Sequence, residues 1–324
     1  MRSVVAVDLG KTSSKLGLWR ADTPGEPSAR PDVVRQAVGV PGIAFPGGLD
    51  AAESAIISLY QEVRQHIQRP WALTVGAAGS MDDPAAAQRL ARRLFDILPA
   101  DDVAVCGDSV TAHAGALRAQ PGVVLSMGTG SVAVGVKEDG TMIRVDGWGP
   151  WLGDEGSGGW IGLAGLRAAM AAFDGRAPAT TLERAAKEFY GELVDLPRLL
   201  AEDGGPVQNA ARFAGSVSRA ADDGDLAAVE IIERAARALA TTVLTAAAQV
   251  QNGSNPVAVA ITGGLRELGA VLLDPVMEHL ANADLTIEVH PPAGNSLDGA
   301  RILTHRHDTP FEPVVHRQTR STDR

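Results

Sequence analysis

The 324-residue sequence is poor in cysteine, in aromatic residues and in positive charge. Its single thiol, Cys106, cannot form an internal disulfide or a cysteine-rich metal site, and we expect it to be buried and inert. The chain has 29 Lys and Arg against 39 Asp and Glu, which gives a formal net charge of −10. Nucleic acid is therefore not expected as a partner, because binding it would require a basic surface.

Long hydrophobic runs are also lacking. Apolar stretches such as residues 238–250 are too short or too interrupted to cross a bilayer. The N-terminus reads as a strand rather than as a signal peptide, so we expect a cytoplasmic protein with no membrane partner. His305 and His307 lie in a polar segment without acidic or cysteine partners at ligand spacing, so we expect no metal site there and a loosely ordered tail.

Alanine and glycine are abundant, and each half of the chain reads strand, strand, strand, helix, strand, helix, strand, helix. The expected strands are residues 4–9, 15–20, 33–38, 71–77 and 103–106, then 123–126, 131–136, 142–145, 257–261 and 285–289. The expected helices are residues 50–68, 84–97 and 110–118, then 225–251, 265–281 and 294–303, with a helical insertion at residues 160–224.

This duplicated order predicts an α/β fold of two lobes, with a mixed five-stranded sheet in each lobe and a helical insertion in the second. We expect an N-terminal lobe at residues 1–119, a C-terminal lobe at residues 120–304 and a polar tail at residues 305–324. The last helix is the element that could instead return to the N-terminal lobe.

Two short turns rich in glycine and hydroxyl groups occupy equivalent places, each after the first strand of a half. They are residues 8–14 (DLGKTSS) and residues 126–131 (SMGTGS). Glycine lets a backbone N–H group approach a phosphate oxygen, and a Ser or Thr hydroxyl adds a donor. The pair predicts a polyphosphate site, with two ordinary hairpins as the alternative. The candidate phosphate-binding residues are Gly10, Lys11, Thr12, Gly128, Thr129 and Gly130.

Asp8, a candidate metal ligand, lies at the end of the first strand, and Asp108, the candidate catalytic residue, follows a later one. Open α/β sheets bind ligands at these strand ends. Asp8 can hold Mg²⁺ against phosphates, through water, or it can cap its turn. Asp108 can be a general base that takes a proton from a substrate hydroxyl as the hydroxyl attacks a phosphate. Its alternative role is the N-cap of the following helix.

Residues 148–160 (WGPWLGDEGSGGW) form the most distinctive run of the chain. Indole faces pack well on the C–H surfaces of sugars, and carboxylates accept hydrogen bonds from neighbouring sugar hydroxyls. Trp151, Asp154 and Glu155 are therefore candidates for sugar binding, and a structural loop anchored by tryptophans is the alternative.

A third glycine turn joins a buried strand to a helix at Thr262, Gly263 and Gly264. Such a turn can lie against the base or ribose of a nucleotide, or it can be only a close corner between strand and helix.

Together these runs resemble the sugar-kinase, Hsp70 and actin superfamily over about residues 3–304. Residues 8–12 look like its first phosphate motif, 128–131 like its second, 107–108 like the segment with the catalytic aspartate, and 262–264 like the adenosine motif. The run from residue 147 to 162 is similar to the BadF/BadG-type ATPases, and within them to the N-acetylglucosamine kinase branch. The resemblance implies a two-lobed actin-like (ribonuclease H-like) ATPase fold that uses ATP and Mg²⁺ and transfers the γ-phosphoryl group to the 6-hydroxyl of a sugar.

Two departures from the family bear on the sugar. Lys11 stands in a first motif that usually reads Gly-Gly-Gly-Thr, and no Asn follows the third strand at residues 39–43. Both features resemble the actinobacterial glucosamine kinases, so D-glucosamine is the expected acceptor, with N-acetylglucosamine as the alternative. Acids near its cationic amino group would be Asp154 and Glu155. Further candidates are Gly79 and Ser80, which we place at the sugar, and the neighbouring Asp82 and Asp83.

Other functions are less well supported. An ATP-driven electron-transfer activator of the same family would need several cysteines for an iron–sulfur cluster, and only Cys106 is present. A kinase-like repressor would need an N-terminal DNA-binding helix-turn-helix, whereas this chain opens on a strand and is acidic. An ATPase without transfer activity stays open, as does a homodimer.

Overall fold

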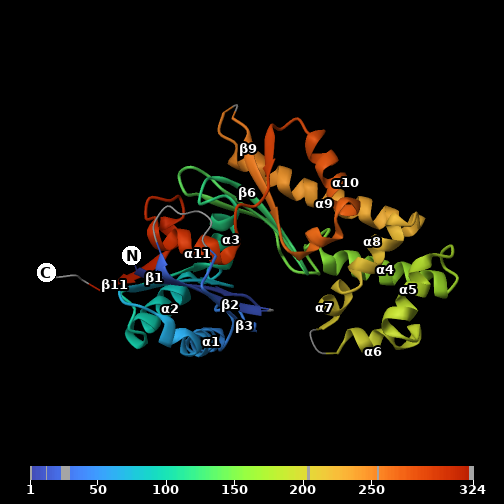
Figure 1. The fold of residues 1–324 in the computed structure, drawn as a ribbon. Helices are drawn as coiled ribbons and strands as arrows, with labels where there is room; N and C mark the ends of the chain where they lie inside the picture. Colours follow the sequence, from blue (N-terminus) through green and yellow to red (C-terminus); the bar gives the residue numbers. More distant parts are fainter. Residues whose placement is uncertain (1, 12, 23–29, 203–204, 254, 321–324) are drawn as a thin grey trace. The chain divides into compact units, whose positions relative to one another are not determined.

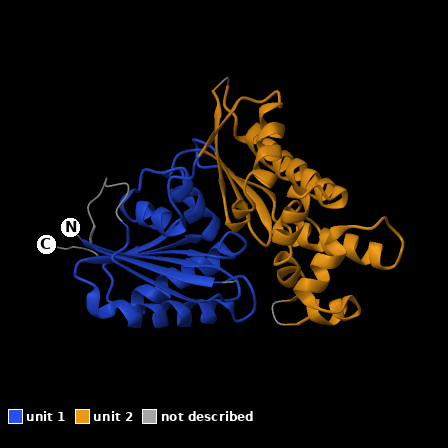
Figure 2. Cartoon of the chain, turned by 45° about the vertical axis from the view of Figure 1, so that its right-hand side comes forward, with its two compact units in different colours: residues 1–121, 137–141, 291–324 blue, residues 122–136, 142–290 orange. Residues whose placement is uncertain are grey.

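The chain divides into two units, each built on a mixed β-sheet (Figures 1 and 2). The computed structural model describes residues 2–11, 13–22, 30–202, 205–253 and 255–320. Unit 1 comprises residues 1–121, 137–141 and 291–324, and unit 2 comprises residues 122–136 and 142–290. The break at residue 121 lies beside the expected lobe boundary, whereas residues 291–304 lie in unit 1 rather than in the second lobe.

The sheet of unit 1 has six strands in the order β11-β5-β4-β1-β2-β3. The strands are β1 (Arg2–Leu9), β2 (Ser13–Asp22), β3 (Val33–Val38), β4 (Trp71–Ala77), β5 (Asp102–Gly107) and β11 (His316–Thr319). β4 pairs in parallel with both β1 and β5, so the carboxyl ends of these three strands lie at one edge of the sheet. β4 is buried along its whole length, as expected for an apolar run in a sheet that is covered on both faces.

Helices cover both faces of this sheet. α1 (Gly48–Val63) and α2 (Pro84–Ile97) share a core with Val5 and Val7 of β1. Because successive strand residues point to opposite faces, Val4 and Ala6 instead pack against α11 (Ser296–His305). α11 also packs closely on α3 (Asp108–Ala116), where a side chain at Gly299 would collide with the backbone of α3. The short 3-10 turn η1 (Arg64–His66) follows α1.

The expectation of a loosely ordered tail is wrong for residues 305–320. A 3-10 turn, η4 (Glu312–Val314), leads into β11, which pairs antiparallel with β5 and makes the sheet six-stranded instead of five-stranded. Arg317 forms an ion pair of 2.6 Å with Glu312. Arg320 donates to the carbonyl oxygens of Phe95, Leu98 and Ala100, at and just beyond the end of α2. Residues 321–324 lie outside the described residues.

The sheet of unit 2 has the expected five strands, and their order is β10-β9-β6-β7-β8. The strands are β6 (Gly122–Met127), β7 (Ser131–Val136), β8 (Met142–Asp146), β9 (Val257–Thr262) and β10 (Ile287–His290). The helices after the insertion are α9 (Leu226–Val250) and α10 (Ala270–Ala281), and a 3-10 turn, η3 (Gly264–Leu268), precedes α10.

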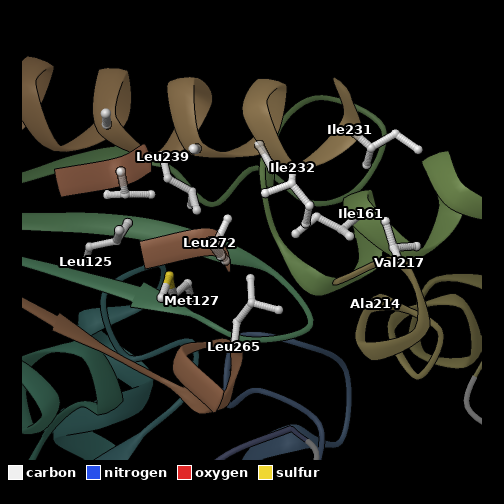
Figure 3. Close-up of a cluster of buried hydrophobic side chains, with 14 of the residues drawn as sticks. Leu125, Met127, Ile161, Ala214, Val217, Ile231, Ile232, Leu239, Leu265 and Leu272 are labelled. Carbon is white, nitrogen blue, oxygen red and sulfur yellow. The ribbon is translucent and has the colours of Figure 1, made fainter. Parts of the chain in front are cut away.

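The helical insertion of unit 2 lies between β8 and α9. It comprises α4 (Gly158–Phe173), α5 (Thr181–Tyr190), η2 (Leu193–Asp195), α6 (Leu196–Leu200), α7 (Gly205–Ala211) and α8 (Ala214–Asp222). One core joins the insertion to the sheet: Figure 3 shows Met127 of β6, Ile161 of α4 and Leu239 of α9 among its buried side chains. α9 begins where the Asp225 carboxylate accepts the Ala228 N–H at 3.1 Å.

The two units repeat one strand arrangement, which confirms the predicted duplication. In unit 1 the first five strands are ordered β3-β2-β1-β4-β5, and in unit 2 the corresponding order is β8-β7-β6-β9-β10. In each, three antiparallel strands are followed by two that run parallel to the first. None of the helices among the described residues is long and apolar enough to cross a membrane.

Candidate functional site

The first glycine turn links β1 to β2 in unit 1, and the predicted strand–turn–strand arrangement is confirmed. The Gly10 N–H donates to the Ser13 carbonyl oxygen at 3.1 Å. A Cβ on Gly10 would lie 2.9 Å from that same oxygen, so the tight turn needs glycine there. Lys11 is exposed, with its Nζ 5.5 Å from the centre of the Phe45 ring. Thr12 lies outside the described residues.

Asp8 and Asp108 stand at the carboxyl ends of two strands that flank β4. Asp8 is in register with Gly76 of β4, and Asp108 follows Gly107, which is in register with Ala77 of the same strand. Their charges interact: burial and the repulsion of Asp108 raise the pKa of Asp8 from 3.8 to about 6, although Lys15 opposes the change. The sheet therefore brings together the two acids that the sequence singled out.

Asp108 is the first residue of α3, and the N-cap position is held by Gly107. The structure therefore does not use Asp108 as the cap. Burial raises the pKa of its carboxyl group, while the Ser109 N–H, which donates to Oδ1 at 2.9 Å, and the charge of Lys11 lower it. A half-buried carboxylate whose proton affinity is raised is suited to accepting a proton.

Gly79 and Ser80 form the turn after β4, one strand away from both acids. Gly79 has a φ of +86°, which favours glycine, and the buried Ser80 hydroxyl donates to the Ala77 carbonyl oxygen at 2.8 Å. The Ser80 hydroxyl therefore stabilises the turn in which it lies. Asp83 caps α2 by accepting the Ala86 N–H at 2.9 Å, which is a structural role.

Backbone hydrogen bonds hold the second glycine turn, which lies in unit 2, against the first turn of α4. The Gly128 N–H donates to the Gly130 carbonyl oxygen at 2.8 Å. In turn, the carbonyl oxygens of Gly128 and Thr129 accept the N–H groups of Gly158 at 2.8 Å and Gly159 at 3.0 Å. The glycines at 158 and 159 let the helix approach this closely, since a Cβ on either would lie within 3.0 Å of those oxygens.

The loop that precedes α4 brings Asp154 to the second turn. Its carboxylate lies beside Gly130, where a Cβ would be 2.8 Å from Oδ2, and it accepts the Ser131 N–H at 3.4 Å. The Ser131 hydroxyl donates to the Glu155 carbonyl oxygen at 2.8 Å. Burial raises the pKa of the Asp154 carboxyl group. Glu155 and Trp151 are exposed, Trp151 to 80%.

The third glycine turn, after β9, lies directly beside the second. The Thr262 hydroxyl donates to the Leu125 carbonyl oxygen at 3.2 Å. Gly263 has a φ of +98°, and a Cβ there would collide with the carbonyl of Met127. Gly264 and Thr129 both line a cavity of about 680 Å³. Unit 2 therefore gathers the second turn, the acidic loop and the third turn, which are far apart in sequence.

The model of the BadF/BadG/BcrA/BcrD ATPase family matches residues 7–296. The chain belongs to this family. An N-acetylmuramic acid/N-acetylglucosamine kinase of Clostridium acetobutylicum is 30% identical over 204 residues, which are 62% of this chain and 65% of that protein. An N-acetyl-D-glucosamine kinase of Dictyostelium discoideum is 46% identical over 61 residues, 19% of each chain. The matches thus span less than two thirds of either relative.

Solved structures with this fold cover nearly the whole chain. A putative N-acetylglucosamine kinase from Chromobacterium violaceum superposes with a TM-score of 0.70 at 23% identity, over 94% of this chain and 98% of that one. A ROK family glucokinase from Streptomyces griseus, bound to glucose and AMPPNP, superposes with a TM-score of 0.54 at 19% identity, over 93% and 98%. These likenesses confirm the predicted fold of this BadF/BadG/BcrA/BcrD ATPase family member.

The carboxylates of Asp8 and Asp108 fit a magnesium ion whose other ligands are phosphate and water oxygens. Among the described residues there is no group of three or more His, Cys, Asp or Glu side chains that could enclose a metal ion. The pair Asp8 and Asp108 offers carboxylate oxygens and leaves most ligand positions to other groups, as Mg²⁺ sites with phosphates and water require. The mutual repulsion of the two carboxylates, which raises the pKa of Asp8, would be relieved by a cation.

Two residues of the site were missed from the sequence. Asp146, at the end of β8, accepts the N–H groups of Gly147 and Asp154 at 2.7 Å and of Glu155 at 3.0 Å, and so shapes the acidic loop. Ser296, in the first turn of α11, forms a side-chain hydrogen bond with Asp8 that lowers its pKa. The capping box of Asn295 and Asp298 signals a helix start there, but it does not say which strand the helix faces.

Proposed function

We propose that the chain is an ATP-dependent kinase that transfers the γ-phosphoryl group to the 6-hydroxyl of an amino sugar, D-glucosamine. The observation that carries this proposal is the position of Asp108, half-buried at the end of β5 with a raised pKa, beside the second carboxylate of Asp8. Phosphoryl transfer to an alcohol needs a base for the hydroxyl proton and a metal ion on the phosphates, and this pair can serve both needs.

In the proposed reaction, Asp108 accepts the proton of the 6-hydroxyl as the sugar oxygen bonds to the γ-phosphorus. The bond between that phosphorus and the bridging oxygen of the β-phosphate breaks, and ADP leaves. Magnesium, when bound, neutralises charge on the phosphate oxygens, and Asp8 would hold it through water. Gly10, Lys11 and Thr12 would contact phosphate groups from the first turn.

The nucleotide would occupy the cavity of about 680 Å³ in unit 2. Gly128, Thr129 and Gly130 would contact its phosphates, and Thr262, Gly263 and Gly264 would lie against adenosine. Leu265, Leu268 and Val271 give the cavity an apolar wall that suits a base, and its volume falls within the range of about 300 to 1,000 Å³ typical of small-molecule sites.

The acceptor would be bound by Asp154 and Glu155 with Trp151, and by the turn of Gly79 and Ser80. Asp154 can accept hydrogen bonds from sugar hydroxyls, and the acids of this loop favour a cationic 2-amino group. N-acetylglucosamine is a second candidate, and the names of the Clostridium and Dictyostelium relatives favour it.

The decisive assay measures ADP release with glucosamine, N-acetylglucosamine, mannosamine and glucose as acceptors, and detects the sugar phosphate as product. We expect an amino sugar to raise ADP release well above the sugar-free rate, with 6-phosphate formed in equal amount. If no sugar raises ADP release, the chain is not a kinase of these sugars, and ATP hydrolysis without transfer becomes the better assignment.

The electron-transfer alternative is tested on the same preparation. Cys106 is buried, and burial raises the pKa of its thiol to about 12, so it does not offer a thiolate at neutral pH. We expect a colourless protein, and the absorbance of an iron–sulfur cluster would contradict the kinase proposal.

A further inference from the structure

Unit 2 holds a second cavity, of about 520 Å³, which adjoins the proposed nucleotide cavity at the start of α4. Gly158 lines the nucleotide cavity, whereas Ser157 and Gly159 line the second one. Asp154 and Trp151, which we assign to the acceptor sugar, also line this second cavity. It therefore continues from the proposed sugar site, and we call it the α4–α9 cavity.

The α4–α9 cavity is longer than one sugar ring. Along α4 its lining residues run from Ser157 to Ala168, which are eleven positions apart, or about 16 Å along a helix. A single pyranose ring beside Asp154 would fill only one end of this length. The rest of the cavity is therefore available to a second group that is joined to the acceptor sugar.

The floor of the cavity is apolar and includes an indole ring. The lining positions on α4 and on α9 each follow the spacing of one face of a helix. Sugar rings pack their C–H faces on indole and aliphatic side chains, so a floor of this kind suits a pyranose ring. The members of the floor are Trp160, Leu163, Ala164, Ala168, Ala227 and Ile231, the last of which is drawn on α9 in Figure 3.

Charged side chains on the two helices supply hydrogen-bond donors and acceptors around this floor. Arg167 of α4 and Glu230 and Arg234 of α9 are exposed and line the cavity. Within the described residues none of the three forms a hydrogen bond or an ion pair, and the recorded partner of Arg234 is the ring of Trp160, 5.2 Å from its guanidinium carbon. Stacking on an indole holds a guanidinium in place while its N–H groups stay available.

The charges that line the cavity balance. Two carboxylates face two guanidinium groups, so a ligand that carries a full charge would be repelled by one pair as well as attracted by the other. A neutral ring with several hydroxyl groups avoids this conflict, because a hydroxyl donates to a carboxylate and accepts from a guanidinium. The four charged residues are Asp154, Arg167, Glu230 and Arg234.

We propose that the α4–α9 cavity binds a second sugar ring, so that the chain phosphorylates the terminal amino sugar of a β-linked disaccharide. This inference rests on the proposed kinase function and extends it to a class of acceptor. The terminal ring would meet Asp154, and its anomeric carbon would carry the second ring over the floor beside Trp160. An equatorial β-linkage keeps the two rings extended, which suits the length of the cavity.

The second ring leaves the chemical step unchanged. The 6-hydroxyl oxygen of the terminal ring bonds to the γ-phosphorus, its proton goes to Asp108, and the bond to the bridging oxygen of the β-phosphate breaks as ADP leaves. The glycosidic bond stays intact, and the product is a disaccharide 6-phosphate. Because the second ring lies away from the reacting atoms, its binding should lower KM more than it raises kcat.

The test compares a disaccharide with a glycoside that lacks the second ring. The probes are the β-1,4-linked dimer of glucosamine and methyl β-glucosaminide, each with free and with acetylated amino groups. We expect the dimer to exceed the methyl glycoside about tenfold in kcat/KM, measured by ADP release, in at least one of the two pairs. Mass spectrometry should find the phosphate on the terminal ring. Equal or poorer use of the dimer in both pairs, or phosphate on the reducing ring, would overturn the proposal.

Variants assign the effect to the cavity. Arg167→Gln and Arg234→Gln should each reduce the preference for the dimer about threefold, because a charged donor is lost. Ala168→Phe fills the end of the cavity that is far from Asp154 and should abolish the preference. Arg237→Gln is the matched control, since Arg237 is an exposed residue one turn further along α9 and does not line the cavity. A preference that survives all three cavity variants would contradict the assignment.

The two proposals fail in different ways. Phosphorylation of glucosamine without any preference for the dimer would leave the kinase function standing and remove the site for the second ring. Tighter calorimetric binding of the dimer than of the methyl glycoside, dependent on Arg167 and Arg234 and without phosphorylation of any sugar, would keep the site and remove the kinase function.

Discussion

Asp108 is the residue on which turnover should depend most. Asp108→Asn keeps the size and the hydrogen bond from Ser109 but cannot accept the hydroxyl proton, so we expect kcat to fall about 10²- to 10⁴-fold with little change in KM. Steady-state ADP release checks this. Asp96→Asn, at an exposed position of α2, is the control and should behave as the unchanged chain. Near-normal turnover of Asp108→Asn would remove Asp108 from the role of base.

Site residues that lie in a recognisable local motif could be predicted from the sequence. Site residues whose role depends on contacts with parts of the chain far away in sequence could not. Asp108 follows a buried strand and Gly263 sits in a glycine turn, and both patterns are visible in the sequence. Asp146 was missed because an acid at the end of a strand looks like any exposed acid until the loop folds back on it. Ser296 contacts Asp8 across 288 positions of sequence, and no local pattern reports such a contact.

At the scale of elements, β11 should contribute measurably to the stability of unit 1. It closes one edge of the sheet through four paired positions with β5, and a backbone hydrogen bond contributes about 1 kcal/mol net. Removing residues 316–324 should therefore lower the free energy of unfolding by about 3 to 4 kcal/mol, as measured by urea unfolding. Removing residues 321–324 alone is the control, and an equal loss in both deletions would contradict a role for the strand.

Most elements could be predicted because their own residues specify them. The apolar runs of β1 and β4, the proline at the start of α2 and the cap at Asp225 each act within a few residues. β11 was missed because its four residues, HRQT, show no apolar alternation. It is held by pairing with β5 and by Arg317 and Arg320, and these contacts exist only after the rest of the unit has folded.

For the whole molecule, the raised pKa of Asp8 lowers the stability of the folded chain at neutral pH. The pKa of Asp8 is raised from 3.8 to about 6, so the ionised form is less stable in the folded chain than in the unfolded chain by about 3 kcal/mol. Because the folded state holds the proton more tightly, this destabilisation grows as the pH rises from about 4 to about 6 and is complete above that range.

Asp8→Asn should therefore stabilise the chain at pH 7.5 by about 2 to 3 kcal/mol in metal-free buffer, while phosphoryl transfer is lost. The advantage should disappear below pH 4, where Asp8 is protonated in both states. Thermal unfolding of the two chains across this pH range is the measurement. A variant that is less stable at pH 7.5, or an advantage that does not depend on pH, would contradict the raised pKa.

Unit 1 is formed by three separate stretches of the chain, and the last stretch, with α11 and β11, is synthesised after unit 2. Residues 2–121 leave the ribosome before roughly 170 further residues that precede α11 and β11, a delay on the order of 10 to 30 seconds at the usual rate of synthesis. During that time α11, the helix that packs on Val4 and Ala6 of β1, is not yet present, and the edge of β5 has no partner. The nascent chain therefore presents an apolar sheet face that a chaperone can bind. The half of the molecule that carries Asp8 and Asp108 is the last to be completed.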